Sequence, residues 1–424
     1  MTDRLRALVV GLGIAGIATT VRLYEIGWEP VIVERAATRR TGGYFIMLFG
    51  TGAASARRLG VLDAIGTRSG PEVSVYEVDR AGRRRPGMNP DAFGSGGPRR
   101  LLRGDVEHGL FSALPQDVQI RYSTVPVRIE QDGAAVDVTL HDLAADTTAT
   151  ERFDLVVGAD GIRSTVRELV FGPGGYELHP LSYMIGATVL DRPVDGFGLS
   201  EGLVLAEPGR SATAFPFADH APSLLFSYRT NDVDAEFARP AIESIRTAFG
   251  PRSPGPILED LFTRYEQASH ALFDSVQQVK MPQWHRGRVV LIGDAAWCLT
   301  LYSGMGASSG IAGGELLGTM LTRHNDDVPA ALRAWEARMR PFIHTQQAAA
   351  KTERRIFTPH NRREQIMRTA TMRLMNVMTA PIIGKAMGKV MAGNGFMKAK
   401  NIDIAAPEQP DGAIRADLHR TENS

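Results

Sequence analysis

Apolar runs of two different kinds alternate over the first 35 residues of the chain. Residues 5–10 form a short apolar run of strand length, with β-branched residues at its end. Apolar residues then recur at helical spacing over 14–26, and Gly27 follows at the position of a helix C-cap. Residues 30–34 form a second strand-like run. This order predicts a strand, a helix and a second strand packed as one unit.

Two further strand-like runs stand beside turns later in the chain. Residues 155–158 lead into a turn at 160–161, after which Ser164 is placed to cap a helix. Residues 288–292 lead into a glycine-rich loop, and a helix is expected to start near Met305. Between these two runs lie four more strand-like runs, which predict an inserted sheet; they are residues 183–190, 202–206, 212–217 and 223–229.

Three glycines in the pattern G-x-G-x-x-G separate the first strand from the first helix. Gly11 allows a tight turn, Gly13 lets the backbone approach a pyrophosphate, and Gly16 lets helix and strand pack closely. The helix N-terminus offers N–H groups and a partial positive charge to phosphates. Glu34 ends the second strand, where a carboxylate can accept hydrogen bonds from ribose hydroxyls and would repel the 2′-phosphate of NADP. The unit alone does not distinguish FAD, NAD and S-adenosylmethionine.

The apolar run at 7–21 follows Arg4 and Arg6 and so imitates a secretory signal. A nucleotide-binding unit is favoured over that interpretation because glycines interrupt the supposed signal helix and a second strand follows directly. No later run approaches 18 apolar residues, so no membrane span is expected. Cys298 is the chain's one cysteine, which excludes an internal disulfide, fits a reducing cytoplasmic setting and is interpreted as a buried structural thiol.

Charge and histidine content exclude two other classes of function. A net charge of +1 gives no reason to expect a nucleic-acid partner. Ten histidines are scattered without metal-ligand spacing, so no metal site is expected. Residues 338–400 are nevertheless basic, with 13 Lys and Arg against Glu353 and Glu364. A helix docked across the other domains is favoured for this segment over one bound to a membrane surface, because aromatic anchors are missing.

With three motifs in order, GLGIAG at 11–16, GADG at 158–161 and IGDAA at 292–296, the chain resembles the class A flavoprotein monooxygenases. These are single-component FAD-dependent aromatic hydroxylases. The stretch 41–66 looks most like members that act on polyketides and tetracyclines. The resemblance implies an α/β fold like that of para-hydroxybenzoate hydroxylase, in which a Rossmann-like FAD-binding domain carries an inserted mixed β-sheet substrate domain and C-terminal helices.

The resemblance also implies which residues hold FAD. Asp294 would bind the ribityl hydroxyls, Arg103 in LLRGDVEHGLFSAL would lie near the flavin, and the helix after Gly304 would point its N-terminus at the ring. Asp160 and Gly161 would lie near the pyrophosphate and near the path of a transient NADPH or NADH. The full set of expected cofactor-binding residues is Gly11, Gly13, Ile14, Ala15, Gly16, Glu34, Arg35, Arg103, Asp160, Asp294, Gly304, Met305, Gly306 and Ala307.

The expected domains are discontinuous. The FAD-binding domain comprises 1–70, 99–173 and 276–337, the substrate domain comprises 71–98 and 174–275, the basic helices span 338–400, and a polar tail spans 401–424. No catalytic residue is assigned. Candidate pocket residues are the aromatic side chains of the inserted strands, which are equally typical of a core, and one residue of the glycine-rich loop; they are Tyr183, Phe215, Phe217, Tyr228 and Leu301.

The loop after GDAA departs from the family pattern. Members usually have a histidine next and then a proline-containing loop, whereas this chain has Trp297 and Leu301. The leading hypothesis is NAD(P)H- and O2-dependent hydroxylation of a large polyketide-type metabolite. The alternative is a redox-neutral cyclase of the [4+2] decalin-forming type, in which FAD is only a structural cofactor. A nucleotide-sensing regulator is disfavoured because no DNA-binding or partner module is evident.

Overall fold

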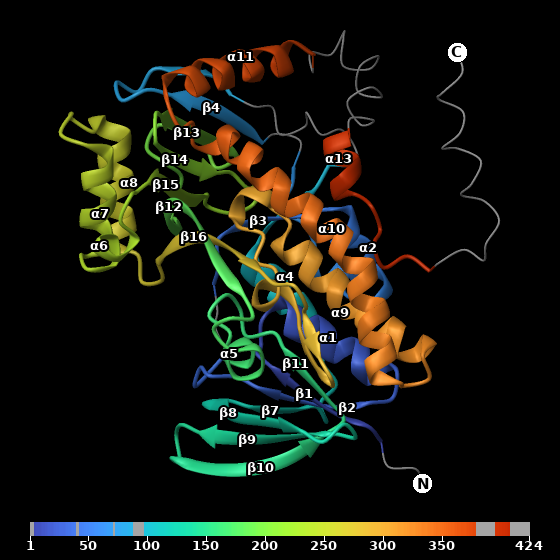
Figure 1. Ribbon diagram of the computed structural model, residues 1–424. Coiled ribbons are helices and arrows are strands. Elements are labelled where there is room, and N and C mark those ends of the chain that lie inside the picture. Colours follow the sequence, from blue (N-terminus) through green and yellow to red (C-terminus); the bar gives the residue numbers. More distant parts are fainter. Residues whose placement is uncertain (1–3, 40–41, 71–72, 88–96, 379–394, 408–424) are drawn as a thin grey trace, which may run out of the picture.

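The computed structural model describes residues 4–39, 42–70, 73–87, 97–378 and 395–407 (Figure 1). The half of the protein that holds the glycine-rich motif at 11–16, which we call the cofactor half, is built on a six-stranded sheet. The strand order is β17-β18-β11-β1-β2-β7, and the strands are parallel except at the edge strand β17. Its strands are β1 (Arg6–Val10), β2 (Glu29–Val33), β7 (Gln119–Arg121), β11 (Leu155–Gly158), β17 (His285–Arg286) and β18 (Val289–Leu291). The predicted strand–helix–strand unit is therefore confirmed, with α1 at Ile14–Glu25.

A seven-stranded sheet of order β16-β12-β15-β14-β13-β4-β5 lies above the first sheet in Figure 1. Its strands are β4 (Ser74–Val78), β5 (Arg84–Pro86), β12 (Glu177–Val189), β13 (Glu201–Glu207), β14 (Arg210–Phe215), β15 (Ser223–Arg229) and β16 (Leu272–Lys280). The four predicted runs are thus β12 to β15. Strand β16 pairs with β12 over most of its length, so the domain boundary expected between 275 and 276 falls inside this sheet.

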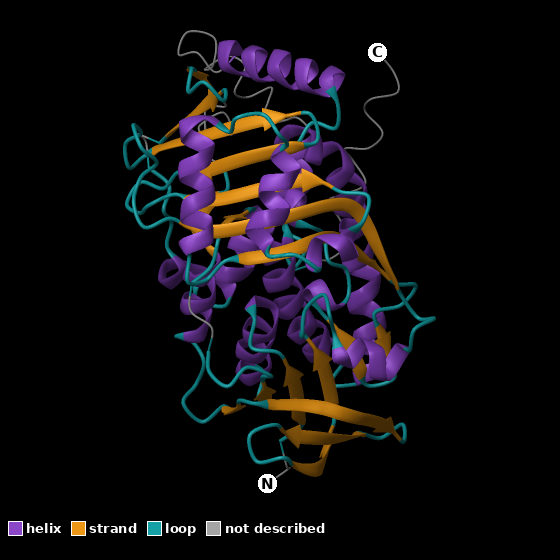
Figure 2. Ribbon diagram, turned by 90° about the vertical axis from the view of Figure 1, so that its left-hand side faces the viewer, coloured by secondary structure: helices purple, strands orange, loops and turns teal. Residues whose placement is uncertain are grey.

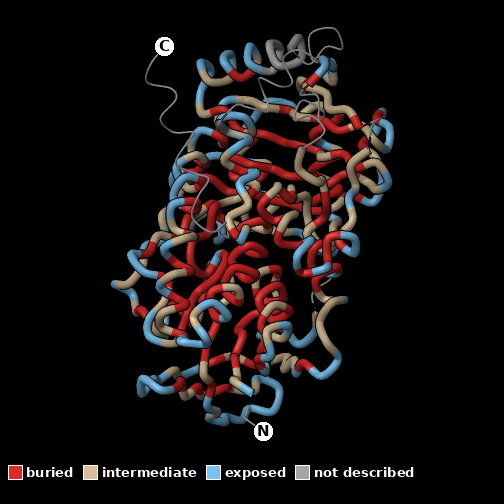
Figure 3. Tube along the Cα trace, turned by 90° about the vertical axis from the view of Figure 1, so that its right-hand side faces the viewer, coloured by how far each residue is buried: buried red, intermediate tan, exposed pale blue. Residues whose placement is uncertain are grey.

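Helices cover one face of this sheet, and the other face is turned toward the cofactor half. Helices α6 (Val233–Phe237), α7 (Ala241–Phe249) and α8 (Gly255–Gln267) cross the outer face, as Figure 2 shows. They bury a hydrophobic core that is separate from that of the cofactor half. Buried segments accordingly follow both sheets in Figure 3, while the hairpins at the lower end are exposed.

Smaller elements complete the cofactor half. An antiparallel sheet holds β8 (Thr124–Gln131), β9 (Val136–Asp142) and β10 (Thr147–Phe153), and β3 (Phe45–Leu48) pairs with β6 (Arg99–Leu102). The remaining helices are α2 (Gly50–Arg58), α3 (Leu62–Ile65), α4 (Arg103–Phe111), α5 (Thr165–Phe171) and α9 (Gly306–Arg323), with 3-10 turns at Gly293–Ala295 and Leu301–Ser303. Ser164 caps α5 by accepting from Arg167 N, as predicted.

Helix α1 packs directly on α9 through a row of glycines, which we call the glycine seam: Gly310, Gly314 and Gly318. A Cβ on Gly314 would lie 2.6 Å from Thr19 Oγ1 and 2.8 Å from Thr19 N. A Cβ on Gly318 would lie 2.4 Å from Arg22 Cγ. The two helices therefore approach each other more closely than any side chain at these positions would allow.

The basic C-terminal helices dock onto both halves. Helix α10 (Val328–Phe357) runs along α9, and α11 (Arg362–Met378) crosses the top of the large sheet (Figure 1). Gln347 on α10 donates to the carbonyl oxygens of Val279 and Trp297, one in each half. Arg368 on α11 forms a bidentate ion pair with Glu77 on β4. Among the described residues, no helix combines the length and apolar character that crossing a membrane requires.

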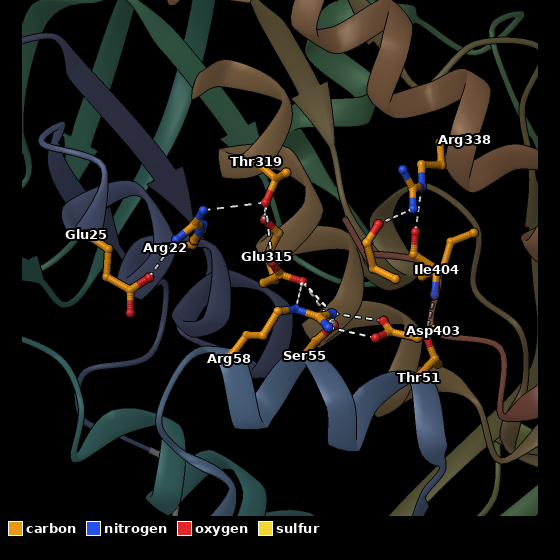
Figure 4. Close-up of polar contacts among 11 residues, drawn as sticks. Arg22, Glu25, Thr51, Ser55, Arg58, Glu315, Thr319, Arg338, Asp403 and Ile404 are labelled. Atoms are coloured by element: carbon orange, nitrogen blue, oxygen red, sulfur yellow. Dashed lines mark hydrogen bonds and ion pairs between the residues drawn. The ribbon is translucent and has the colours of Figure 1, made fainter. Parts of the chain in front are cut away.

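Residues 398–406, which we call the C-terminal strap, cross α2, α9 and α10. The strap begins in α13 (Gly395–Lys400). Figure 4 shows Arg58 of α2 bridging Asp403 of the strap and the buried Glu315 of α9, at 2.7 and 2.9 Å. Arg338 on α10 donates to the Ile404 carbonyl oxygen at 2.7 Å (Figure 4). The first part of the expected polar tail is thus packed against the protein, and its remainder lies outside the described residues.

We predict that Gly314→Ala destabilises the fold by about 1–3 kcal/mol, since the added methyl group would overpack the glycine seam. Urea unfolding would measure the loss. Gly174→Ala is the matched control, because Gly174 is exposed and a Cβ there meets nothing within 4 Å. Equal stability of Gly314→Ala and the control would contradict the close contact.

Candidate functional site

The loop that joins β1 to α1 is built around three glycines. Gly11 has a φ of +106°, and a Cβ there would lie 2.6 Å from the Ala159 carbonyl oxygen. A Cβ on Gly16 would lie 2.0 Å from the Gly11 carbonyl oxygen, so packing of the chain requires both glycines. Gly13 differs, because the nearest atom to an added Cβ is Arg103 Nη2 at 3.8 Å. Its missing side chain leaves room on the side of the loop that faces a cavity.

That cavity has a volume of about 370 Å³ and lies between the glycine loop and the seven-stranded sheet. The volume falls within the usual range for small-molecule sites. The structure brings most of the expected cofactor residues to its wall, namely Gly13, Ile14, Ala15, Arg103, Asp294, Gly304, Gly306 and Ala307. Gly306 has no atom within 4 Å of an added Cβ, so a ligand can approach the start of α9 closely.

The other expected cofactor residues lie elsewhere. Glu34 accepts hydrogen bonds from Leu12 N and Ala36 N, both at 2.9 Å, and so stands beside the glycine loop. Each of its carboxylate oxygens has a further lone pair for a ribose hydroxyl. The Arg35 guanidinium donates to Thr165 Oγ1 at 3.0 Å.

The side chains of Asp160 and Met305 make their contacts within the protein. The Asp160 carboxylate accepts from Ser164 Oγ, Thr165 N and Val166 N, so it caps α5 and does not face the cavity. Its neighbour Gly161 lines the cavity instead. The Met305 side chain is fully buried in the core. The GADG motif thus contributes Gly161 to the cavity wall and Asp160 to the cap of α5.

Asp294 stands at the centre of the cavity wall. Its side chain is accessible from the cavity, although protein surrounds it on the other sides. This enclosure raises the pKa of the carboxyl above its ordinary value, and the nearby charge of Arg103 opposes that rise. Arg103 is itself anchored by an ion pair with Glu107 at 2.8 Å. A carboxylate that protein encloses on several sides and that is accessible from the cavity is suited to accept hydrogen bonds from a hydroxylated ligand.

Two further groups on the wall stay protonated. Burial raises the pKa of the Tyr44 hydroxyl above its ordinary value. Burial, together with the charge of Asp294, raises the pKa of the Cys298 thiol well above its ordinary value. A thiol in that state is a poor nucleophile, in agreement with the interpretation of Cys298 as structural.

The loop between the GDAA turn and α9 divides into a buried part and a part that faces the cavity. Trp297, which stands where the family has histidine, is 1% exposed and packs against Trp284 and Trp335. That departure from the family therefore lies in the core. Thr300 and Leu301 line the cavity, and Thr300 has a φ of +70°, which is strained for a β-branched residue. The Thr300 hydroxyl is buried without a hydrogen-bond partner among the described residues.

The roof of the cavity is the inner face of the seven-stranded sheet. Phe215 on β14 stacks on Phe45 of β3 with ring centroids 4.2 Å apart and planes inclined by 6°. Both rings line the cavity, as do Ile185 and Leu225. The two rings add apolar surface to the cavity wall.

The predicted pocket residues differ in where their side chains lie. Phe215 and Leu301 line the cavity, whereas Tyr183 and Phe217 are buried just behind its lining. Tyr228 is a correction: it points to the opposite face of the sheet, in the core below α6 to α8, and its hydroxyl donates to Glu236 at 2.8 Å. Side chains on β15 alternate between faces, and Leu225 faces the cavity, so Tyr228 cannot.

Sequence reasoning missed several residues of the wall. They come from β3, from β16 and from the end of α10, and are Tyr44, Phe45, Met47, Asp274, Gln277 and Phe357. The glycine pair before β3 gave a signal of close approach, since a Cβ on Gly43 would lie 2.8 Å from Gly104 N. The pairing of β3 with β6 is nonlocal and left no pattern in the sequence.

A glycine loop, a central carboxylate and an aromatic roof around one cavity define a dinucleotide-dependent enzyme that acts on a small molecule. The chain matches the family model described as "FAD binding domain" over residues 4–346, and it belongs to that family. A flavin-dependent monooxygenase of Legionella longbeachae is 28% identical, with 82% of this chain and 88% of that protein covered. FAD-dependent monooxygenase asL4 of Sarocladium schorii is 25% identical, with coverage of 84% and 89%.

Solved structures agree on the fold. Tetracycline destructase Tet(55) superposes with a TM-score of 0.76 at 24% identity, with 96% of this chain and 100% of that chain covered. Klebsiella pneumoniae HpxO, complexed with FAD and uric acid, gives a TM-score of 0.71 at 18% identity, with coverage of 93% and 97%. These structures confirm the predicted architecture, and the family match together with the monooxygenase relatives confirms the flavoprotein monooxygenase family and the cofactor FAD.

We predict that Asp294→Ala and Glu34→Ala each weaken FAD binding by roughly five- to 150-fold. Each change leaves buried sugar hydroxyls unpaired, at a cost of about 1–3 kcal/mol. Titration of apoprotein with FAD, followed by flavin fluorescence, measures the affinity. Tyr228→Phe is the control, because its hydroxyl lies on the far face of the sheet. Unchanged affinity in both carboxylate variants would refute this placement of the cofactor.

Proposed function

We propose that the protein is an NAD(P)H- and O2-dependent hydroxylase of a large, flat, polyketide-type metabolite. The observation that carries the proposal is that one cavity joins the FAD-binding loops to the stacked pair Phe45 and Phe215. A planar substrate would lie against these rings, because aromatic groups stack with their faces offset and parallel. The names of the relatives, which include flavin-dependent monooxygenases and a tetracycline destructase, support the same reaction class.

The residues present fit FAD. Gly13 and Gly306 leave space at the N-termini of α1 and α9, where the pyrophosphate and the flavin ring would bind. Glu34 and Asp294 would accept hydrogen bonds from the hydroxyls of the ribose and the ribityl chain. When bound, FAD supplies the chemistry: it is reduced by the nicotinamide and activates dioxygen.

The chain's own residues supply position and exclude water. The apolar roof residues Ile185, Phe215 and Leu225 would hold the substrate face against the cofactor and keep the site dry. No side chain of the wall is assigned as a general base.

The redox-neutral cyclase is the second candidate, and one observation favours it. Thr300 and Leu301 stand where the family has a proline-containing loop, and both line the cavity. Trp297 no longer contributes to this alternative, because it lies in the core. A cyclisation would need only a shaped apolar cavity that holds the two reacting ends together.

Stopped-flow mixing separates the two candidates. For the hydroxylase, NADPH or NADH with an accepted polyketide-type phenol bleaches the flavin, and O2 restores its colour with formation of hydroxylated product. For the cyclase, a linear polyene substrate is converted anaerobically without nicotinamide and the flavin stays yellow. A flavin that no combination of nicotinamide and substrate bleaches would rule out the hydroxylase.

The position of Phe215 in the cavity roof leads to a prediction about substrate binding. Phe215→Leu should raise KM by up to about tenfold, since a stacked aromatic pair contributes about 0.5–1.5 kcal/mol beyond its buried area. The affinity for FAD should not change. Steady-state kinetics and FAD titration measure the two quantities, with Tyr228→Phe as the control on the opposite face. An unchanged KM would show that substrate does not bind against this ring.

A further inference from the structure

Lys400 joins the C-terminal strap to α10 through a buried ion pair and to the loop before α9 through a hydrogen bond. Lys400 of the strap and Glu353 of α10 are 3.0 Å apart, and both side chains are 4% exposed. Lys400 Nζ also donates to the Ser303 carbonyl oxygen at 2.5 Å and lies 4.9 Å from the centre of the Phe49 ring. Removing two charges from water is costly, so a buried ion pair is weak evidence for a contribution to stability.

Ser303 organises the loop that Lys400 holds. Its hydroxyl donates to the Thr300 carbonyl oxygen and accepts from Met305 N, at 3.0 and 3.1 Å. Gly304, the next residue, has a φ of +63°, and a Cβ there would lie 3.0 Å from Met47 Cε. The loop therefore packs against β3 on one side and lines the cavity on the other. The hydrogen bond from Lys400 holds its Ser303 carbonyl group.

Other bonds set the position of Lys400 itself. Gln346 on α10 donates to the Ala399 carbonyl oxygen, and Gly50 N at the start of α2 donates to Asn401 Oδ1 at 2.9 Å. A few residues later, Arg58 holds Asp403 (Figure 4). Lys400 does not line the cavity, so it can affect a bound cofactor only through the loop and through its charge.

We propose that Lys400 is a positioning residue for the flavin, because its ammonium group fixes the loop that presents the N-terminus of α9 to the ring. This inference rests on the proposed placement of FAD beside Gly304 to Ala307. The ammonium also adds a positive charge behind that N-terminus, and Glu353 offsets part of it. Both the charge and the helix dipole favour a flavin that becomes anionic on reduction.

The test uses three variants of the full-length protein. Lys400→Met removes the ammonium and keeps the length of the side chain, Glu353→Gln removes the opposing charge and keeps the Lys400 bond to Ser303, and the double variant removes both charges. Lys398→Met, an exposed lysine two residues earlier, is the control. Apoprotein is titrated with FAD, and the reduction potential of the bound flavin is measured by equilibration with a reference dye.

Lys400→Met and the double variant are expected to bind FAD about tenfold or more weakly, which corresponds to one lost charge-assisted hydrogen bond. Lys400→Met should lower the reduction potential and Glu353→Gln should raise it, while Lys398→Met should change neither quantity. Opposite shifts of potential distinguish a positioning charge from a merely structural ion pair, since breaking a structural pair from either side would act alike.

Three results would overturn the proposal: Lys400→Met with the affinity and potential of the parent, Glu353→Gln with an unchanged or lowered potential, or equal effects of Lys398→Met and Lys400→Met. If Lys400→Met does not fold, the potential of Glu353→Gln decides. Asp294→Ala, measured alongside, separates this proposal from the placement of FAD. Weakened binding in Asp294→Ala with none in Lys400→Met refutes the role of Lys400 alone, and unchanged binding in both refutes the placement.

Discussion

The glycine seam between α1 and α9 is the contact on which the rest of the site depends. Helix α1 starts at the glycine loop and α9 starts at Gly306, so the seam sets the distance between two helix N-termini that open on one cavity. Each terminus offers unpaired N–H groups and a partial positive charge. In the proposed placement of FAD, the end of α1 would meet the pyrophosphate and the end of α9 would meet the flavin ring, so the seam would set the distance between these two parts of the binding site.

The carboxylates near these two helices differ in what they contact. Carboxylates that structure the backbone, such as Asp160, are occupied by N–H and O–H donors, while Asp294 is left facing the cavity. Arg103 lies near Asp294 and is itself held by Glu107, and no histidine is among the described residues that line the cavity. In the proposed function, selectivity would come from hydrogen-bond geometry and shape, and reactivity would come from the cofactor.

The parts that could be predicted from the sequence are those encoded by local pattern. The strand–helix–strand unit, the Ser164 cap and the inserted strands β12 to β15 all follow from runs of fewer than 15 residues. The direction of a side chain on a strand could not be predicted from the sequence. Phe215 and Tyr228 are both aromatic, and only the pairing register of their strands places Phe215 in the cavity and Tyr228 in the core below α6 to α8. Trp297 shows the same limit, since a motif position does not say which way its side chain points. The pairing of β3 with β6 and the contact of Lys400 with Ser303 join residues more than 50 positions apart and leave no periodic signal.

The C-terminal strap has a consequence for biosynthesis. The strands of the six-stranded sheet come from residues 6 to 291. The C-terminal strap, which contacts α2, α9 and α10, is translated after them. The glycine loop, by contrast, leaves the ribosome among the first residues. Domains generally fold from the N-terminus while synthesis continues. Because the residues proposed to hold FAD include Gly304 to Ala307, we expect FAD to bind only after most of the chain has been made.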